Sequence, residues 1–442
     1  MKRAIGLAGA IGLAASVAIA ATSASPAPSF SDARTYATGR YPISIAIHDL
    51  NGDRKPDLAV SNAHANTVSV LLRSGGGFQA NRDYATGLRP REVAAGDLNG
   101  DGKPDLATAN LDANTVSVLL NGGSGKFQEE TDYPTGTGAI SIAVGDLNGD
   151  RKPDLVTADI DGTLSVLLNK GDGSFRAKRS YPAGASPFSV VVRDLNGDGK
   201  SDLATVNQDA STVSVLLNKG HGSFRPRRVY RVGEDSESDP ESLAVGDLNG
   251  DSKPDLVAGN AFESTVSVLL NRGNGSFRPK RDYRTGYNST PRAVAIGDLN
   301  GDGKPELATA NDDLSTVSVL VNRGNGTFQA KLEYAAGRRP IAVAIRDLNG
   351  DGKPDLAAAS GRASTVSVLI NKPGLCTVQN LRGKLPPAAE NTIVRANCRV
   401  GKVRRGYSKT VERGRVASQS PKPGTVLPGG SKVDFVVSLG RG

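Results

Sequence analysis

Residues 49–57 read DLNGDRKPD, a short stretch in which oxygen-bearing side chains alternate with other residues. Asp49, Asn51, Asp53 and Asp57 occupy positions 1, 3, 5 and 9, and the lysine at position 7 offers its backbone carbonyl. Oxygens from alternate residues of a loop, with a Gly where the chain turns sharply, suit a hard cation such as Ca²⁺. A single stretch of this kind is also compatible with an ordinary polar turn built from Asx hydrogen bonds.

The stretch occurs seven times in the 442 residues, which favours a structural repeat over a chance turn. Successive copies begin 48, 49, 48, 53, 51 and 49 residues apart. Their first residues are Asp49, Asp97, Asp146, Asp194, Asp247, Asp298 and Asp347. A repeat of this length is typical of propeller blades.

Four short segments of each repeat have the character of β-strands. In the second copy they are residues 92–96, 105–110, 115–120 and 127–133, which are rich in Val, Ala, Thr and Tyr and too short for helices. Four short antiparallel strands make one blade. The sequence therefore predicts an all-β fold, a seven-bladed β-propeller over residues 30–371, which suits a chain with 53 Gly and only 5% aromatic residues.

The two ends of the array indicate how the ring closes. Six copies carry a Phe and a Tyr six residues apart, as in Phe127 and Tyr133, and we place both on the last strand. The seventh copy lacks this pair, whereas Phe30 and Tyr36 precede the first copy. We therefore predict that an N-terminal strand completes the last blade and removes the free sheet edges. The metal loops and the Gly-rich turns then share one face, and variable loops, the longest at residues 231–241, form the other.

The N-terminus has the pattern of a secretory signal peptide, predicted at residues 1–24. Lys2 and Arg3 precede an uncharged apolar run at residues 4–20, and cleavage motifs end at Ala20 and Ala24. An uncleaved membrane anchor is the alternative, but the run is short for one, and no later stretch could span a membrane. We expect a secreted or cell-surface bacterial protein, where millimolar calcium is available and disulfides form.

The basic charge of the chain is concentrated after the repeats. The whole chain has a net charge of +9, but residues 373–442 alone contain 13 Lys and Arg against 3 Asp and Glu. Such a surplus suits nucleic acid, an anionic envelope polymer or a membrane surface. Only Tyr407 and Phe435 supply aromatic rings there, so we favour an envelope polymer and predict no nucleic-acid binding.

The same region is predicted to fold as a small α+β domain at residues 375–440. A helical pattern lies within residues 385–398, and residues 418–439 have the pattern of strand, turn and strand, after a hinge at residues 372–374. A Cys376–Cys398 disulfide would close a loop of 22 residues and add about 3 kcal/mol.

The repeat, with its DxNxDGxxPD-like loop and GxGxF turn, resembles the FG-GAP or VCBS repeat over residues 30–371. That family forms the seven-bladed propeller of integrin alpha chains and of many bacterial secreted proteins. The resemblance implies up to seven Ca²⁺ ions, each held by positions 1, 3, 5 and 9. The implied ligands are Asp49, Asn51, Asp53, Asp57, Asp97, Asn99, Asp101, Asp105, Asp146, Asn148, Asp150, Asp154, Asp194, Asn196, Asp198, Asp202, Asp247, Asn249, Asp251, Asp255, Asp298, Asn300, Asp302, Glu306, Asp347, Asn349, Asp351 and Asp355.

Some copies depart from this pattern. Position 6 is Arg54, Arg151 or Ser252 where other copies have Gly, so we expect a strained turn and weaker binding there. Glu306 at position 9 of the sixth copy predicts a looser site. An EF-hand is excluded because strands flank the loop and position 12 carries no acid, being Val60 in the first copy.

The C-terminal region resembles a PASTA domain, named for penicillin-binding proteins and serine/threonine kinases. The matching residues are Cys376-Thr377-Val378, the stretch LRGKL at 381–385, the helix with Cys398, and GRVASQSP at 414–421. The resemblance implies contact with peptidoglycan or its fragments.

Together these features favour a non-catalytic binding or adhesion module whose ring meets an unidentified glycan or protein. We expect that ligand near residues 231–241 and 287–288. A lectin or a polysaccharide-active, lyase-like enzyme on the same propeller is the alternative. The first catalytic candidates would be Glu234, Asp235, Glu237 and Asp239, although we favour a solvated acidic loop for these residues. The sequence contains no catalytic constellation that we recognise.

Overall fold

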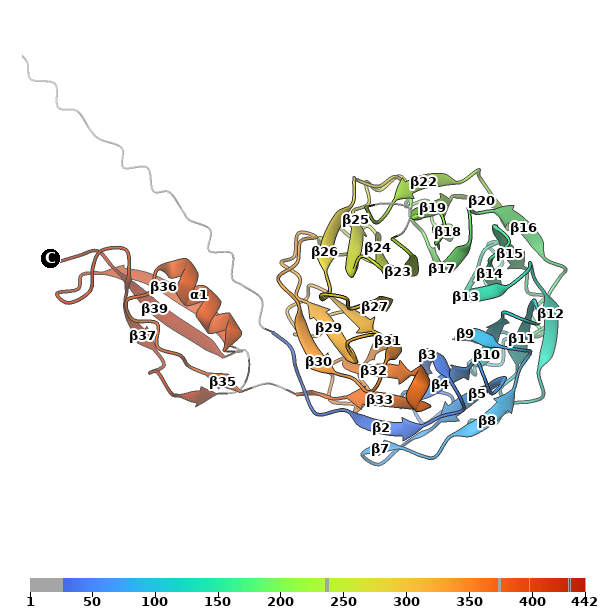
Figure 1. The fold of residues 1–442 in the computed structure, drawn as a ribbon, viewed down its shortest axis with the longest axis horizontal. Coiled ribbons are helices and arrows are strands. Elements are labelled where there is room, and N and C mark those ends of the chain that lie inside the picture. Colours follow the sequence, from blue (N-terminus) through green and yellow to red (C-terminus); the bar gives the residue numbers. More distant parts are fainter. Residues whose placement is uncertain are drawn as a thin grey trace, which may run out of the picture.

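The computed structural model describes residues 27–234, 238–372, 375–396, 398–427, 429 and 431–441. The predicted signal peptide, Asp235, Glu237 and the predicted hinge at residues 373–374 lie outside the described residues. The described part is mostly β and contains seven four-stranded antiparallel sheets, typical of propeller blades. These sheets are arranged in a ring, with the small C-terminal domain as a separate unit in the sequence (Figure 1).

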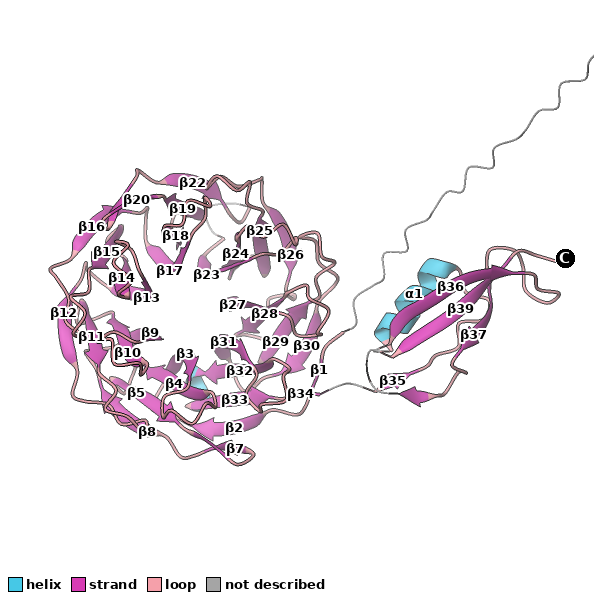
Figure 2. Ribbon diagram, turned by 180° about the vertical axis from the view of Figure 1, so that it is seen from behind, coloured by secondary structure: helices cyan, strands magenta, loops and turns pink. Residues whose placement is uncertain are grey.

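Each sheet runs from an inner strand to an outer strand (Figure 2). The inner strands are β3 (Pro42–His48), β9 (Pro90–Gly96), β13 (Ala139–Gly145), β17 (Pro187–Arg193), β23 (Pro240–Gly246), β27 (Pro291–Gly297) and β31 (Pro340–Arg346). The second strands are β4 (Asp57–Asn62), β10 (Asp105–Asn110), β14 (Asp154–Asp159), β18 (Asp202–Asn207), β24 (Asp255–Asn260), β28 (Glu306–Asn311) and β32 (Asp355–Ser360). We number the sheets as blades one to seven in this order.

The third strands are β5 (Thr67–Leu71), β11 (Thr115–Leu119), β15 (Thr163–Leu167), β19 (Thr212–Leu216), β25 (Thr265–Leu269), β29 (Thr316–Leu320) and β33 (Thr365–Leu369). The outer strands are β8 (Arg82–Ala85), β12 (Thr131–Pro134), β16 (Arg179–Pro182), β22 (Arg228–Arg231), β26 (Arg281–Arg284), β30 (Leu332–Ala335) and, in blade seven, β2 (Arg34–Ala37). Short elements in the turns are β6 (Arg73–Ser74), β7 (Gly77–Phe78), β20 (Asn218–Gly220), β21 (Ser223–Phe224) and the 3₁₀ turn η1 (Gly361–Ala363).

The hydrophobic core lies between neighbouring blades. Every residue of the second strands is buried, and these strands carry mainly Leu, Val and Ala on both faces. One cluster joins Leu50 and Val70 of blade one to Val93 and Leu106 of blade two, and similar clusters follow around the ring. Small β-branched and aliphatic side chains fill these spaces, which explains how so few aromatic residues suffice.

The N-terminal segment completes blade seven, as the sequence predicts. Strand β2 pairs with β33, with Tyr36 opposite Val366, and β1 (Ser29–Phe30) pairs with β34 (Asn371–Lys372). Ser31 also exchanges hydrogen bonds with Ile370. The last sheet of the array therefore takes its outer strand from the start of the chain.

The aromatic pairs link neighbouring blades. Tyr84 on the outer strand of blade one packs edge-to-face on Phe127 of blade two, with 5.3 Å between the ring centroids. Six further interfaces have the same T-shaped contact. The prediction that Phe127 and Tyr133 share the last strand is wrong. Phe127 instead forms an isolated bridge with Asn121, and strand β12 begins only at Thr131.

The C-terminal domain combines one helix with a short sheet. Its elements are β35 (Cys376–Thr377), α1 (Pro386–Arg395), β36 (Arg399–Gly406), β37 (Val416–Ser420), β38 (Val426–Leu427) and β39 (Lys432–Ser438). Strand β39 is central, with β36 parallel and β37 antiparallel to it. Cys376 and Cys398 form the predicted disulfide and are buried with Phe435. Among the described residues, no helix has the length and apolar character needed to cross a membrane.

Candidate metal centres

The aspartate at position 1 organises each loop by accepting backbone hydrogen bonds. In the second copy, Asp97 Oδ1 accepts from the N–H groups of Gly100 (2.8 Å) and Asp101 (3.1 Å), and Oδ2 accepts from Gly102 (2.9 Å). Asn99 Oδ1 adds a bond from Asp101 N–H at 2.9 Å. All seven copies keep the bonds from positions 4 and 6 to the first aspartate. The loop is therefore wound around this carboxylate.

This winding requires a left-handed backbone at position 6. Arg54, Arg151 and Ser252 have φ angles of 63°, 66° and 62°, and the Gly residues of the other copies have similar values. A side chain at such a φ costs conformational energy that Gly avoids. The strain predicted for the first, third and fifth copies is therefore present in the backbone.

The acid at position 9 is buried behind the loop and joins it to the sheet. Asp105 is 0% exposed, and its Oδ2 accepts from Leu98 N–H (2.8 Å) while its Oδ1 accepts from Asn121 N–H (2.7 Å). Burial, together with the nearby carboxylates of Asp53 and Asp49, raises the pKa of the equivalent Asp57 to about 6. The same group of residues thus places several negative charges close together.

The sixth copy differs because Glu306 is longer by one methylene. Its Oε1 accepts from the Asn300 amide at 3.0 Å, and its bond from Asn322 N–H lengthens to 3.3 Å. In the other six copies the equivalent bond measures 2.6 to 2.8 Å. Burial raises the pKa of Glu306 to about 8.

The lysine at position 7 contacts the acid at position 5. Lys103 Nζ lies 2.7 Å from Asp101 Oδ2, and the first, fourth and fifth copies have the same pair at 3.1 to 3.2 Å. In the third copy, Lys152 instead donates to the Lys170 carbonyl. These pairs are largely exposed, so each contributes little to stability.

The donor atoms of each loop fit a hard cation in chemical type, since all four side chains offer oxygen. However, the described residues contain no group of three or more His, Cys, Asp or Glu side chains arranged to hold a metal. The position 1 and position 9 carboxylates are turned toward backbone N–H groups, as described above. Calcium binding therefore stays a prediction that rests on donor chemistry and on the crowding of negative charge.

Comparison with family models decides the family. The model described as FG-GAP-like repeat matches six overlapping segments, at residues 49–108, 97–157, 146–205, 194–258, 247–309 and 298–358. The chain belongs to the FG-GAP-like repeat family. A PASTA domain matches residues 377–439. No curated protein matches the chain.

Solved structures share the fold of the FG-GAP ring at low sequence identity. The virginiamycin B lyase of Staphylococcus aureus aligns with a TM-score of 0.56 and 13% identity, over 77% of this chain and 99% of that one. BBS1N, solved in complex with ARL6DN, aligns with a TM-score of 0.55 and 13% identity, over 78% of this chain and 97% of that one. A lectin of Agrocybe aegerita that recognises non-reducing terminal N-acetylglucosamine aligns with a TM-score of 0.51 and 20% identity, over 78% of this chain and 97% of that one. At these identities the similarity concerns the fold alone.

The FG-GAP repeats also contain an asparagine that sequence reasoning missed. Asn169 follows the third strand of blade three, and its Nδ2 donates to the carbonyls of Leu98 and Pro153, both at 2.8 Å. Its Oδ1 accepts from Gly171 N–H at 2.7 Å. Because Leu98 lies in the loop of blade two and Pro153 in the loop of blade three, this side chain ties adjacent loops together.

Five other blades repeat this asparagine contact. The equivalent residues are Asn121, Asn218, Asn271, Asn322 and Asn371. Blade one has Arg73 instead, whose Nε is buried without a hydrogen-bond partner. The signal was present in the sequence as an Asn two residues after six of the seven third strands, but it resembles an ordinary turn residue.

Of the catalytic candidates in the long loop, Glu234 and Asp239 are described, whereas Asp235 and Glu237 lie outside the described residues. Glu234 donates its N–H to Glu263, and Ser238 Oγ donates to the same carboxylate. Tyr287, near the expected ligand surface, is 81% exposed. The long loop is therefore held by local contacts among its described residues, and Glu241 at its end turns toward the middle of the ring.

Proposed function

We propose that this chain is an exported, non-catalytic binding protein. In this proposal the FG-GAP ring is a closed seven-bladed propeller that Ca²⁺ stabilises and that meets a ligand. The PASTA domain holds a polymer of the bacterial cell envelope such as peptidoglycan. The observation that carries the proposal is an exposed basic strand at the edge of the PASTA domain.

That strand is β36, which pairs with β39 along one side only. Lys402, Arg404 and Arg405 lie along this strand and are exposed, and Tyr407 follows with 73% of its surface accessible. Clustered cations beside an exposed aromatic ring attract and contact an anionic polymer. PASTA domains often bind peptidoglycan, so the chemistry and the family support the same partner.

The electrostatics of the acidic loops support the calcium part of the proposal. The carboxylates at positions 1, 5 and 9 of one loop repel one another, and a divalent cation between them and the position 3 amide would remove that repulsion. An ion at about tenfold excess over its dissociation constant adds about 1.4 kcal/mol per site. Seven independent sites would add at most about 10 kcal/mol.

Thermal unfolding with and without calcium tests this part. We expect EGTA to lower the Tm of the full mature chain and millimolar calcium, but not magnesium at the same concentration, to restore it. An unchanged Tm in EGTA would show that the loops are self-sufficient turns.

Sedimentation with purified peptidoglycan tests the attachment. The full mature chain should sediment with the polymer, and the R404E and R405E double variant should remain in solution. The control is R281E with R284E, which reverses two exposed charges on the outer strand β26 of the ring. The proposal is contradicted if all three proteins sediment equally with peptidoglycan, or if the wild type does not sediment with it.

The alternative is a polysaccharide-cleaving enzyme on the same ring. It predicts release of unsaturated or reducing sugar products, whereas the binding proposal predicts saturable binding without turnover. Incubation of the protein with polysaccharide, followed by absorbance and reducing-end assays, separates the two.

A further inference from the structure

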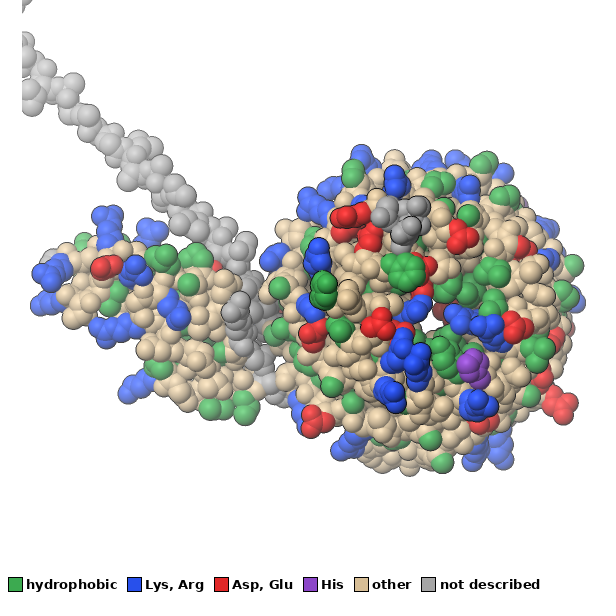
Figure 3. Space-filling model, viewed as in Figure 1, with side chains coloured by type: hydrophobic (Ala, Val, Ile, Leu, Met, Phe, Trp, Pro, Cys, Tyr) green, Lys and Arg blue, Asp and Glu red, His purple; other side chains and the backbone are tan. Residues whose placement is uncertain are grey.

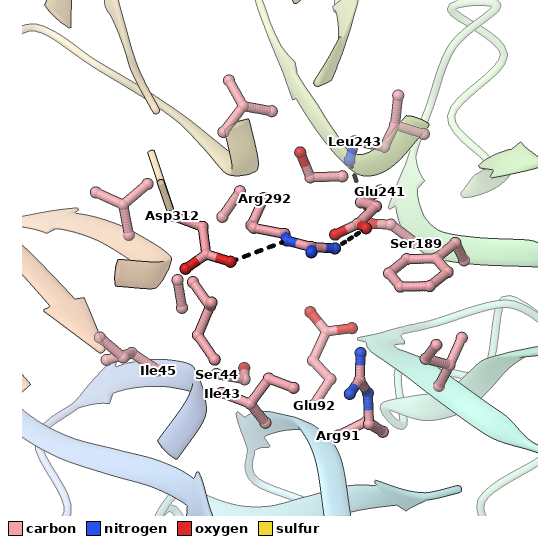
Figure 4. A pocket seen from close by; sticks show the side chains of 18 of the residues that line it. Ile43, Ser44, Ile45, Arg91, Glu92, Ser189, Glu241, Leu243, Arg292 and Asp312 are labelled. Atoms are coloured by element: carbon pink, nitrogen blue, oxygen red, sulfur yellow. Dashed lines mark hydrogen bonds and ion pairs between the residues drawn. The ribbon is translucent and has the colours of Figure 1, made fainter. Parts of the chain in front are cut away.

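A cavity of about 290 Å³ lies where the inner strands of all seven blades converge. We call it the axial pocket. Each inner strand contributes its second residue to the lining, and most of these strands contribute the residues that follow it as well. The second residues are Ile43, Arg91, Ile140, Phe188, Glu241, Arg292 and Ile341. The pocket therefore sits on the ring axis, near the ends of these strands that follow the variable loops (Figure 4).

The charged residues of this pocket break the repeat. Four blades place Ile or Phe at the second position, so an apolar side chain satisfies the packing there. Arg91, Glu241 and Arg292 are thus not required by the blade architecture. Charged groups that depart from an otherwise regular repeat, and that face a common cavity, indicate a binding site.

Glu92, at the next position of β9, is also a charged residue that the blade architecture does not require. Its Oε2 accepts from Ile142 N–H of the next blade at 3.0 Å. In three other blades a serine at this position makes the equivalent bond: Ser44, Ser141 and Ser189 accept from the N–H groups of Val93, Val190 and Leu243. A serine hydroxyl is therefore enough for this contact, and the charge of Glu92 is additional.

Most of these charges are paired, but one guanidinium is not. Arg292 pairs with Glu241 and lies 3.6 Å from Asp312, which also pairs with Arg339 at 2.6 Å. Arg91 lies over the ring of Phe188, 5.9 Å from its centroid. Within the described part of the chain, the Arg91 guanidinium makes neither a hydrogen bond nor an ion pair. Its planar fork of N–H donors is available for a carboxylate.

Exposed cations lie on loops that precede three of the inner strands. The loops that lead into blades one, two and seven carry Arg40, Arg89 and Arg338, all of them exposed. Figure 3 shows Lys and Arg side chains gathered around the central opening, with Asp and Glu side chains beside them. A cationic rim around a cavity steers negatively charged ligands into it.

We propose that the axial pocket binds a small sugar acid, a ligand that carries one carboxylate and several hydroxyl groups. Arg91 receives the carboxylate, and the hydroxyls donate to Glu92 and Glu241. The three carboxylates of the pocket disfavour a ligand with two negative charges, such as phosphate, but accept hydrogen bonds from neutral donors. The volume is at the lower end of small-molecule sites and suits one sugar ring.

This assignment deepens the proposed binding role of the ring and rests on it, but not on calcium or on the PASTA domain. Isothermal titration of the full mature chain with glucuronate tests it, with glucose and inorganic phosphate as the comparison ligands. Glucose has the same ring without the carboxylate. We expect glucuronate to bind at least about tenfold more tightly than either.

Three variants locate the site. R91I should weaken glucuronate binding by at least about tenfold, and it should fold because Ile occupies this position in blades one, three and seven. R91K keeps the positive charge but lacks the planar set of guanidinium N–H donors, so it should bind glucuronate with intermediate affinity. The matched control is R82I, which removes an exposed arginine from the outer strand β8 and should bind like the wild type.

Glucuronate binding that R91I leaves unchanged, or phosphate binding of equal strength, overturns the axial site. If glucuronate fails to bind while the protein still sediments with peptidoglycan, the axial site is wrong and the attachment proposal stands. If glucuronate binds through Arg91 while sedimentation fails, the attachment proposal is wrong and the axial site stands.

Discussion

The asparagine that ties adjacent loops gives the most direct test of how the ring holds together. We consider the substitution N169A. It removes two bonds donated to the carbonyls of Leu98 and Pro153 and one accepted from Gly171 N–H. Leu98 O keeps a bond from Gly173 N–H, whereas the described contacts of the Pro153 carbonyl include only Asn169.

The expected cost follows from these contacts. A hydrogen bond lost from a buried site costs about 1 kcal/mol net, so three bonds amount to about 3 kcal/mol. For a domain of this size, each kcal/mol lowers the Tm by roughly 2 °C, which predicts a decrease of about 6 °C. Scanning calorimetry of the wild type and the variant in the same calcium concentration measures it.

Two further variants separate hydrogen bonding from packing. N169D has nearly the same shape but cannot donate, and its charge would face two carbonyl oxygens, so it should be less stable than N169A. The control N274A removes an exposed asparagine whose side chain accepts only local bonds from Ser276. A Tm for N169A equal to that of N274A, or a Tm for N169D equal to the wild type, refutes this account.

Three other predictions concern the axial pocket, the N-terminal strand β2 and the first blade. Burial raises the pKa of Glu241 to about 7 from an ordinary 4.5. The folded state therefore keeps this proton to a higher pH, and stability should fall as pH rises from about 4.5 to 7. E241Q should flatten that part of a urea-unfolding pH profile, and an identical slope would exclude Glu241 as its source. Y36A should expose the N-terminal strand to limited proteolysis, because it removes the contact with Phe78 from a strand that no turn connects to its partner β33. Y84A, which removes the equivalent contact inside a continuous repeat, should not, and equal cleavage of both variants would contradict this explanation. R73N should raise the Tm, because it removes a buried unpaired Nε and supplies the asparagine that six other blades use; a lower Tm would mean that Arg73 has a role of its own.

The architecture was largely readable from the sequence because it depends on local, repeated patterns. Strand length, alternation and the recurring acidic loop predicted four-stranded sheets, and the displaced Phe30 and Tyr36 predicted the pairing of β2 with β33. The position of Phe127 was predicted wrongly. Its spacing from Tyr133 suggested one continuous strand, whereas the chain leaves the sheet between them and the two rings of a repeat contact different blades.

The details of the sites were harder to predict because they depend on contacts between repeats. Asn169 and Leu98 are 71 residues apart, and no local sequence pattern predicts the hydrogen bond between them. The burial of Asp105 behind its loop depends likewise on the strand packed against it. Arg91, Glu241 and Arg292 each look like an ordinary surface charge until the ring brings their strands to one axis.

The completion of blade seven by the N-terminal strands has a consequence for the order of events during biosynthesis. Ser31 and Ile370, which are bonded in the finished ring, are 339 residues apart, so the segment that carries Ser31 leaves a ribosome or a translocation pore long before its partner does. Until then the growing array has two open edges and no means of sealing them. Closure is therefore a late step, and a product that stops before β33 would lack the partner of its own first long strand.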